Sequence, residues 1–354
     1  MGAVISVSKT NMMNYKDLEA LFEAGLGSDF FGPQSSYPYL MLEADDNDIS
    51  SEVAQLLAEL PCVVCVIFNK LEKLPDNLFY AADVVVDTLS DADHIAQNVT
   101  EFPIASLVLT QHLRLIENLD FEAALTAESF AYALLQGGGE FKTWLANRET
   151  PPETKAVYNP LVMTRDAQHL IVNLNAPDSH NEIDITLRDA LCEAFELAMI
   201  DDAIEKLSIS ASGKSFSIGG ALSEFGQVAN PATAHWIRSI RLPGRLLARL
   251  VWRDKPVHVK AHLNGPAIGA GLELAAFAHE VTAHSKAWIQ LPEITMGLIP
   301  GAGGTVSVSR RIGRHKTAYM TLTGKRIRAE TACAWGLIDK IETRAETQSE
   351  RESL

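Results

Sequence analysis

Short apolar runs and longer stretches with helical spacing alternate along the first part of the chain. Runs of apolar and β-branched residues predict strands at 39–43, 63–69 and 82–87. Two longer segments, 104–119 and 121–147, have apolar positions on more than one face, and a run of glycines interrupts the second. We therefore expect a small α/β unit followed by helices that pack against another part of the protein or against another subunit.

The pattern changes after a polar, proline-rich stretch at 148–155, which is typical of a connection between folding units. From there strands and helices alternate, with predicted elements at 170–174, 184–200, 206–211, 257–263 and 271–278. Repeated strand-then-helix units predict an α/β fold whose active site lies on loops at strand ends. We divide the chain into an N-terminal α/β and helical domain at 1–150, a second domain at 156–342 and a polar tail at 343–354.

Composition narrows the classes of function. The 354 residues carry a net charge of −15, so the protein as a whole repels the phosphates of nucleic acids. No apolar run approaches the roughly 20 residues that a membrane-spanning helix needs. Four cysteines in a chain of this length fit a reducing compartment, so we expect a cytoplasmic protein without a nucleic-acid or membrane partner. Cys62 and Cys65 have the spacing of a redox or metal motif, but they lie in a buried-strand pattern, and we interpret them as packing residues.

Three glycine-containing stretches carry the candidate chemistry, at 213–222, 264–274 and 290–305. In the first two, small residues follow a predicted strand, and consecutive glycines leave backbone N–H groups unshielded by side chains. A glycine pair alone is more often a turn than an anion-binding site. The functional hypothesis therefore depends on the three stretches taken together.

In this order and at these separations, the three stretches resemble the crotonase superfamily, the enoyl-CoA hydratases and isomerases, over roughly 157–341. The elements that carry the resemblance are NGPAIGAGLEL at 264–274, PEI at 292–294, PGAGGT at 300–305 and WGLI at 335–338. The resemblance implies a spiral of ββα units and a homo-oligomer, a trimer or hexamer. It also implies an enoyl-CoA hydratase/isomerase-type lyase of fatty acid metabolism. The implied substrate is an acyl-CoA thioester, with coenzyme A as part of the substrate and with no separate cofactor or metal.

The same resemblance assigns roles to individual residues. The backbone N–H groups of Gly220 and Ala270 correspond to the oxyanion hole, and Ala270 would lie at a helix N-terminus, which favours an anion. Glu273 corresponds to the residue that activates water, and Glu293 to the one that exchanges the proton at the α carbon. The remaining substrate-binding positions are Ile218, Gly219 and Gly301.

The chemistry of a thioester explains why such a site needs these groups. Hydration or deprotonation next to the thioester builds negative charge on its oxygen, and each preorganised N–H donor lowers the barrier by about 3 to 4 kcal/mol. On spacing alone, however, Glu273 is equally a first-turn residue that complements a helix dipole. The complete template, rather than either carboxylate alone, supports the catalytic interpretation.

The chain departs from the family at several positions. Ala221 stands where many members have Asp, and Ala176 stands where Arg is frequent, which removes one possible contact to coenzyme A. The tail after Ile341 is short and polar, whereas typical members continue into helices that cover the active site and join subunits. We hypothesise that the N-terminal helices, above all 121–147, provide this cover or subunit contact.

Three other functions stay open. Double-bond isomerisation needs one carboxylate, so two carboxylates favour a hydratase without excluding an isomerase. The layout also resembles the cofactor-independent dioxygenases that act on dihydroxyphenylacetyl-CoA, although these carry Gln where this chain has Glu273. From another class, a crotonase-like protein could bind acyl-CoA or a protein partner without turnover, and the intact Glu273 and Glu293 argue against it.

A group of basic residues lies outside this template, at Arg238, Arg241, Arg245, Arg249, Arg253 and Lys255. On one unbroken helix they would form a stripe that could hold the phosphates of coenzyme A. Pro243 and Gly244 break such a helix, so we favour a solvated or subunit-facing surface. His258 and His262 share one face of a predicted strand without a matching ligand set, and we interpret them as structural.

Overall fold

The computed structural model describes residues 12–23, 30–35, 37–44, 49–70, 73–149, 159–228 and 230–342. Residues 150–155 of the predicted connection lie outside this part of the chain, as does the whole predicted tail at 343–354. Within the described ranges, no helix combines the length and the apolar character needed to cross a membrane.

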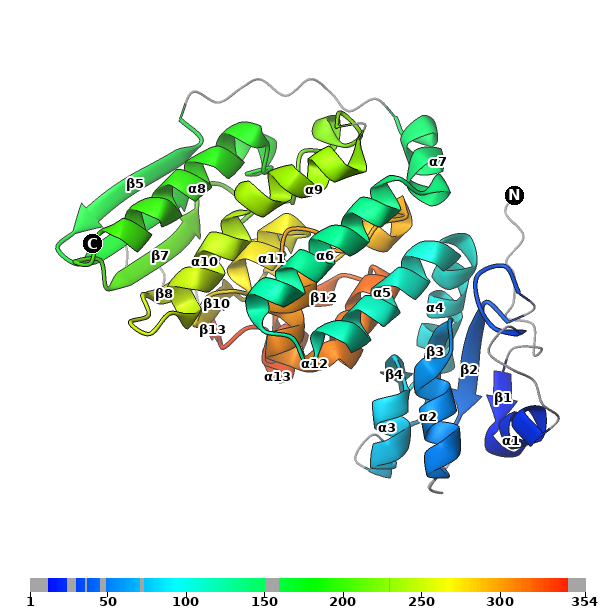
Figure 1. The fold of residues 1–354 in the computed structure, drawn as a ribbon. Coiled ribbons are helices and arrows are strands. Elements are labelled where there is room, and N and C mark those ends of the chain that lie inside the picture. Colours follow the sequence, from blue (N-terminus) through cyan, green and yellow to red (C-terminus); the bar gives the residue numbers. More distant parts are fainter. Residues whose placement is uncertain are drawn as a thin grey trace.

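The N-terminal region contains a four-stranded parallel sheet, drawn in blue shades in Figure 1. Its strands, in spatial order, are β1 (Met12–Asn14), β2 (Tyr39–Glu43), β3 (Val63–Ile67) and β4 (Val84–Val86). The helices of this region are α1 (Tyr15–Glu23), α2 (Ser51–Glu59) and α3 (Asp76–Ala81). Cys62 and Cys65 are fully buried in two different hydrophobic clusters, in agreement with their interpretation as packing residues.

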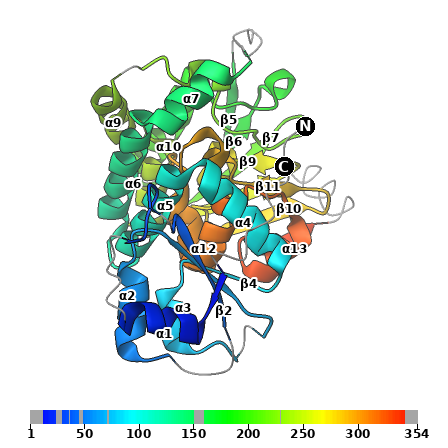
Figure 2. The same cartoon turned by 90° about the vertical axis from the view of Figure 1, so that its right-hand side faces the viewer.

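Four helices connect this sheet to the second half of the chain. They are α4 (Leu89–Glu101), α5 (Pro103–Ile116), α6 (Phe121–Gln136) and α7 (Gly139–Asn147). The helix α6 begins at a cap formed by the Asp120 side chain, which accepts a hydrogen bond from the amide of Ala123 at 2.9 Å. As Figure 2 shows, α5 and α6 lie against the second half, where they contact α12 (Gly304–Thr323), and α6 also packs on α9 (Pro231–Ile240).

The second half is organised around a six-stranded sheet with the order β13-β10-β8-β7-β6-β5. Its strands are β5 (Leu161–Asp166), β6 (His169–Leu174), β7 (Lys206–Ala211), β8 (His258–Leu263), β10 (Glu280–His284) and β13 (Lys340–Glu342). All neighbouring strands are parallel except β5, which pairs antiparallel with β6 at one edge. The helices α8 (Ile185–Ile200) and α10 (Pro243–Trp252) pack together beside this sheet (Figure 1).

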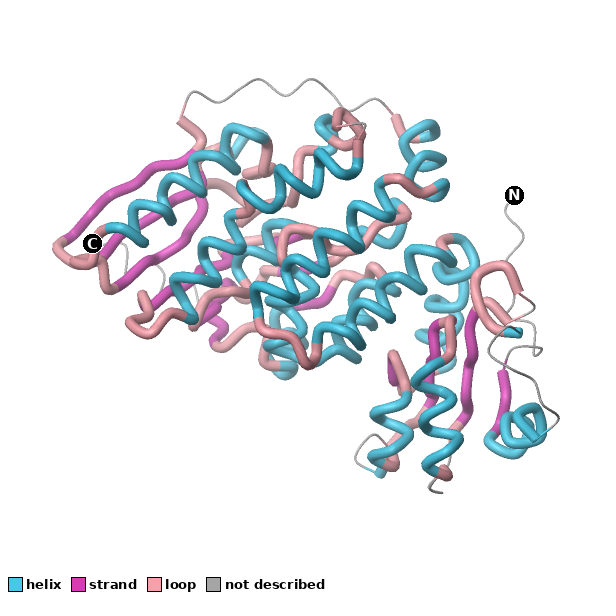
Figure 3. Tube along the Cα trace, viewed as in Figure 1, coloured by secondary structure: helices cyan, strands magenta, loops and turns pink. Residues whose placement is uncertain are grey.

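A small second sheet, in the order β12-β11-β9, gives the chain its strand-strand-helix repeat. Its strands are β9 (Ala267–Ile268), β11 (Trp288–Gln290) and β12 (Ile327–Arg328). The chain runs from β8 through β9 into α11 (Ala270–Ala275), and then from β10 through β11 and a 3-10 turn, η6 (Glu293–Met296), into α12. The last helix among the described residues is α13 (Ala329–Trp335). Figure 3 distinguishes the strands, in magenta, from the helices, in cyan.

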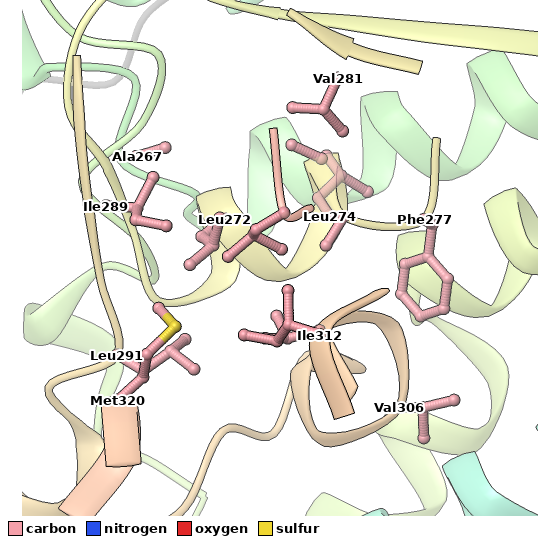
Figure 4. Packing of buried hydrophobic residues seen from close by; sticks show 14 of the residues in the cluster. Ala267, Leu272, Leu274, Phe277, Val281, Ile289, Leu291, Val306, Ile312 and Met320 are labelled. Carbon is pink, nitrogen blue, oxygen red and sulfur yellow. The ribbon is translucent and has the colours of Figure 1, made fainter. Parts of the chain in front are cut away.

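The core of the repeat is apolar and continuous with the rest of the molecule. In Figure 4, Leu272 and Leu274 of α11 lie between the strand residues Ala267 and Ile289 and the α12 residue Ile312. These side chains belong to one buried cluster that also contains residues of the N-terminal sheet. The helices α5 and α6 therefore share a core with the second half, and burial of this apolar surface holds them against it.

The predicted α/β class, with a smaller α/β and helical region before a spiral of ββα units, is confirmed. The predicted strands and helices are present, with ends that differ by a few residues. The helix expected at 271–278 is shorter, ending at Ala275. The edge strand β5 was not predicted, because four of its six residues are exposed and its three apolar residues are consecutive instead of alternating with polar ones.

Candidate active site

One cavity of about 470 Å³ collects every residue that the sequence assigned to the site. Its walls come from the loop after β7, from the turn between β9 and α11, from η6, from the segment before α12, and from α6 and α9. The predicted residues that line it are Ile218, Gly219, Gly220, Ala270, Glu273, Glu293 and Gly301. Segments separated by more than 150 residues thus meet at one place, since α6 supplies Tyr132 and η6 supplies Glu293.

The amide of Gly220 points away from the loop that pairs with it. Ile183 donates its N–H to Gly219 O at 2.8 Å, and Ala221 donates its N–H to Ile183 O at 3.1 Å. Because a strand alternates the direction of its N–H groups, the amide between them faces the opposite side. Ala270 lies close to this loop, since a β-carbon built on Gly219 would lie 3.6 Å from Ala270 N.

Ala270 is the first residue of α11, and the position before it can be occupied only by glycine. Gly269 has a φ of +47°, and a β-carbon there would lie 2.6 Å from Glu293 Oε1. Its own amide donates to Gln290 O at 3.0 Å, which ties the turn to β11. As the first residue of the helix, Ala270 has no intrahelical acceptor for its N–H. Gly220 and Ala270 both line the same cavity.

Glu273 lies one helical turn beyond Ala270 and is 2% exposed. Its Oε2 accepts two hydrogen bonds at 2.7 Å, from the amides of Ala302 and Gly304. Burial, followed by the charges of Glu293 and Glu128, raises the pKa of Glu273 well above its ordinary value, although the two amides act in the opposite direction. The carboxyl group is thus fixed in place and kept in contact with the cavity.

Glu293, the first residue of η6, is 8% exposed and faces the same cavity. Its Oε2 is buried and has no hydrogen-bond partner among the described residues. Burial and, after it, the charge of Glu128 raise the pKa of Glu293 to about 8. Glu273 and Glu293 interact electrostatically, so the two carboxyl groups share their protons as a pair.

The sequence analysis did not assign Glu128 and Tyr132 of α6, or Arg238 of α9, to the site. Glu128 is 1% exposed and binds the segment that also holds Glu273. Tyr132 lines the cavity, and the guanidinium of Arg238 lies over its ring at 4.6 Å from the centroid. The signal for Glu128 was present, because this acid falls between Leu125 and Tyr132 on the otherwise apolar side of a predicted helix.

The interpretation of the arginines as a solvated or subunit-facing surface is wrong for the members that contact α6. The group is divided between α9 and α10, as the Pro243 position predicted. Arg238 donates to Gln136 Oε1 at 3.0 Å, and Arg245 donates to Glu122 Oε2 at 3.2 Å. These arginines therefore join the N-terminal helix to the second half of the same chain. Arg241 lines the cavity with an exposed side chain.

The two strand histidines make contacts within the sheet, in keeping with a structural role. The His258 ring stacks on His279, with 5.2 Å between centroids. His262 Nδ1 lies 2.9 Å from Thr282 Oγ1 on the neighbouring strand β10. Neither histidine lines the cavity that contains Glu273 and Glu293.

The second half of the chain is similar to known proteins. Residues 165–354 match the family model described as enoyl-CoA hydratase/isomerase. The chain is 34% identical over 181 residues to 2,3-dehydroadipyl-CoA hydratase of Escherichia coli (strain K12), covering 51% of this chain and 68% of that protein. It is 32% identical over 177 residues to the mitochondrial enoyl-CoA hydratase of Pongo abelii, covering 48% and 57% of the two chains.

Among solved structures, an enoyl-CoA hydratase from Thermoplasma volcanium GSS1 is similar, with 31% identity and a TM-score of 0.47. That match covers 55% of this chain and 76% of the other. The family model begins at residue 165, so α4, α5, α6 and α7 lie outside it. The side chains of Glu128 and Tyr132 thus come to the cavity region from a part of the chain that the family model does not include.

Proposed function

Because the chain belongs to the enoyl-CoA hydratase/isomerase family, we propose that it is a hydratase that adds water, with syn geometry, to a 2-enoyl-CoA. One observation carries the proposal. Two buried carboxyl groups, those of Glu273 and Glu293, line the same cavity as the amides of Gly220 and Ala270. Two acid–base groups and two backbone donors are the set that hydration of a conjugated thioester requires.

In this proposal the two amides bind the thioester oxygen. Attack at the β carbon moves the electrons of the carbon–carbon double bond toward that oxygen, which becomes the negatively charged end of an enolate. The N–H groups of Gly220 and Ala270 are fixed before the reaction by their neighbours' hydrogen bonds, so they need little reorganisation as the charge develops. We assign about 3 kcal/mol of transition-state stabilisation to each donor.

The two carboxyl groups have different surroundings, which supports different roles for them. Two amide N–H groups stabilise the ionised form of Glu273. In contrast, Glu293 Oε2 has no hydrogen-bond partner among the described residues, which favours the protonated form of Glu293. Glu273 therefore takes a proton from water as the oxygen of that water molecule bonds to the β carbon. Glu293 gives its proton to the α carbon, and the sum of the two transfers is addition of one water molecule.

The proposed chemistry uses no separate cofactor. The carboxyl pair handles both protons, and the amides stabilise the enolate, so coenzyme A takes part only as the carrier of the acyl group. The acyl-CoA is the partner we propose for this cavity, whose lining includes Ile183, Ile218 and Ile237 beside the polar groups. Apolar side chains of this kind suit the hydrocarbon part of an acyl chain.

We also propose a cytoplasmic homo-oligomer. Apolar side chains are exposed on the adjacent helices α6 and α9, where Leu134 is 65% exposed and Trp236 is 59% exposed. Exposed apolar residues on neighbouring helices favour contact with another subunit. Multi-angle light scattering on the purified protein tests self-association, and a monomer at micromolar concentration would count against it.

The test of the enzymatic proposal uses crotonyl-CoA. Hydration removes the conjugation between double bond and thioester, so the ultraviolet absorbance of the enoyl thioester decreases and 3-hydroxybutyryl-CoA appears. An isomerase would instead produce this absorbance from a 3-enoyl-CoA, and a dioxygenase would consume oxygen with an aromatic acyl-CoA. An acyl-CoA-binding protein without catalysis would leave all three signals unchanged.

A further inference from the structure

Glu128 connects the N-terminal helix α6 to the catalytic segment of the second half. The helix crosses the second half in Figure 1, and its Glu128 side chain is almost completely buried, at 1% exposure. It does not line the cavity, so it lies behind the wall that faces the substrate. Burial of a carboxyl group is unfavourable unless hydrogen bonds compensate for the lost water, which directs attention to its partners.

Those partners alternate with the partners of Glu273 along four consecutive residues. Glu273 Oε2 accepts from the amides of Ala302 and Gly304, both at 2.7 Å. Glu128 Oε1 accepts from the amide of Gly303 at 2.7 Å, and Glu128 Oε2 accepts from the amide of Thr305 at 2.9 Å. The carboxylates of Glu128 and Glu273 therefore hold the 302–305 segment from opposite sides. If the loss of Glu128 displaces this segment, the amides that bind Glu273 move with it.

A further contact fixes Glu128 itself. The Thr305 hydroxyl donates to Glu128 Oε2 at 2.5 Å, and its oxygen lies 2.8 Å from Nε2 of His112, on helix α5. Because burial lowers the pKa of His112 to about 4, the ring is neutral and can donate its Nε2 proton to Thr305. The chain of contacts thus runs from α5 through Thr305 to α6, entirely within buried groups.

We propose that Glu128 is a positioning residue of the active site, which holds the 302–305 segment for Glu273 and whose charge sets how the proton is shared between Glu273 and Glu293. Its influence on turnover rests on the proposed hydratase function. Its influence on the protons of the pair depends only on the contacts within the protein. Helix α6 is by this proposal a part of the catalytic apparatus as well as a packing element.

The charges around Glu128 support the second half of the proposal. The titratable and charged groups that interact with it, directly or through Thr305, are His112 of α5, Tyr132 of α6, Arg238 of α9, Arg245 of α10, Glu273 of α11 and Glu293 of η6. Burial raises the pKa of Glu128 to about 7, against the hydrogen bonds from Thr305 and Gly303, which lower it. Ionised Glu128 in turn raises the pKa of both Glu273 and Glu293.

Two substitutions distinguish the effect of the charge of Glu128 from the effect of its side-chain length. Glu128→Gln removes the charge and turns an N–H group toward a backbone N–H group, whereas Glu128→Asp keeps the charge on a shorter side chain. Glu122→Gln is the matched control, because it makes the same chemical change on α6 at a residue that pairs with Arg245 and Arg249. The readouts are kcat and KM for crotonyl-CoA, their pH profiles, and an infrared titration of the protonated carboxyl band without substrate.

For Glu128→Gln we expect kcat to fall about 10- to 100-fold with little change in KM, because Glu273 is displaced. Loss of the negative charge should move both limbs of the pH profile, and the infrared titration, to lower pH. Glu128→Asp should lower kcat while leaving the limbs close to those of the wild type, and Glu122→Gln should match the wild type throughout.

The proposal would be overturned if folded Glu128→Gln kept the wild-type kcat, the wild-type pH profile and the wild-type infrared titration. That result would leave the hydratase function intact. If Glu128→Gln does not fold, unchanged kcat in Glu128→Asp overturns it instead. A wild type that hydrates no enoyl-CoA, together with a shifted infrared titration in Glu128→Gln, would reject the hydratase function and support the electrostatic role of Glu128.

Discussion

The ring of Tyr132 lies directly against the α-carbon of Gly301. A β-carbon added to Gly301 would be 2.2 Å from Tyr132 Cδ2, much closer than carbon atoms can approach. Tyr132 belongs to α6, whereas Gly301 precedes the amides that bind Glu273. The distance between helix and catalytic segment at this point is thus set by the absence of a side chain.

Gly301→Ala should therefore separate α6 from the 302–305 segment. We expect the free energy of unfolding to fall by about 1 to 3 kcal/mol, as for other overpacked sites, together with a loss of activity. Differential scanning calorimetry and the crotonyl-CoA assay measure the two effects. Gly139→Ala is the control, since a β-carbon there meets no atom within 4 Å.

The double substitution Gly301→Ala with Tyr132→Ala shows whether the tyrosine ring causes the loss. Removal of the ring gives the added methyl group its space, so the double variant should be more stable than the sum of the two single effects predicts. Strict additivity would show that the close approach of Tyr132 to Gly301 does not limit this packing.

The role of the Ala270 amide can be tested by removing its proton. Ala270→Pro eliminates the N–H, and proline is well tolerated at the first residue of a helix. We expect kcat to fall about 100- to 1,000-fold, as for the loss of one oxyanion donor in other enzymes. Ala270→Gly keeps the donor and should remain within a few-fold of the wild type.

If Ala270→Pro has the melting temperature of the wild type and its full kcat, the Ala270 amide does not stabilise the enolate. A lower melting temperature would call for comparison at a temperature where both proteins are folded, and full activity there would contradict the assignment equally.

The buried carboxyl groups predict how stability depends on pH. The pKa of Glu293 is about 8 in the folded protein and near 4.5 in an exposed glutamate, so the folded state binds more protons between these values. The contribution of Glu293 to the free energy of unfolding therefore decreases as the pH rises from about 4.5 to about 8, the reverse of an ordinary carboxylate in an ion pair. Urea denaturation at a series of pH values measures the slope.

Glu293→Gln removes one of these groups and should make that slope shallower, whereas Glu122→Gln, in a partly exposed ion pair, should leave it nearly unchanged. An equally steep slope in Glu293→Gln would mean that Glu293 titrates in the folded protein as it does in the unfolded chain.

Gly220 and Ala270, the proposed backbone donors, could be assigned to the cavity from the sequence because each belongs to a short continuous motif. The turn before Ala270 requires glycine for its backbone and for the approach of Glu293, and such requirements are written in a few neighbouring residues. The strands β2 and β7 were predicted with the observed ends, since their apolar patterns are short and clearly bounded.

The contribution of α6 could not be located in this way. Glu128 and Thr305 are 177 positions apart, and no local pattern tells which amides a buried acid will meet. The hydrogen-bond partners of the arginines could not be predicted for the same reason, because Glu122 precedes Arg245 by 123 positions. The single local sign was an acid among apolar residues of a helix, which predicts a buried polar contact without identifying it.

Hydration of crotonyl-CoA by the wild type and by Glu273→Gln, Glu293→Gln and the double variant tests the central claim most directly. We expect measurable kcat in the wild type and a loss of about 100- to 10,000-fold in each single variant, with KM little changed. Because the two groups act as a unit, the double variant should be hardly worse than the more impaired single variant. Retention of near wild-type kcat in either folded single variant would contradict the shared acid–base role of Glu273 and Glu293.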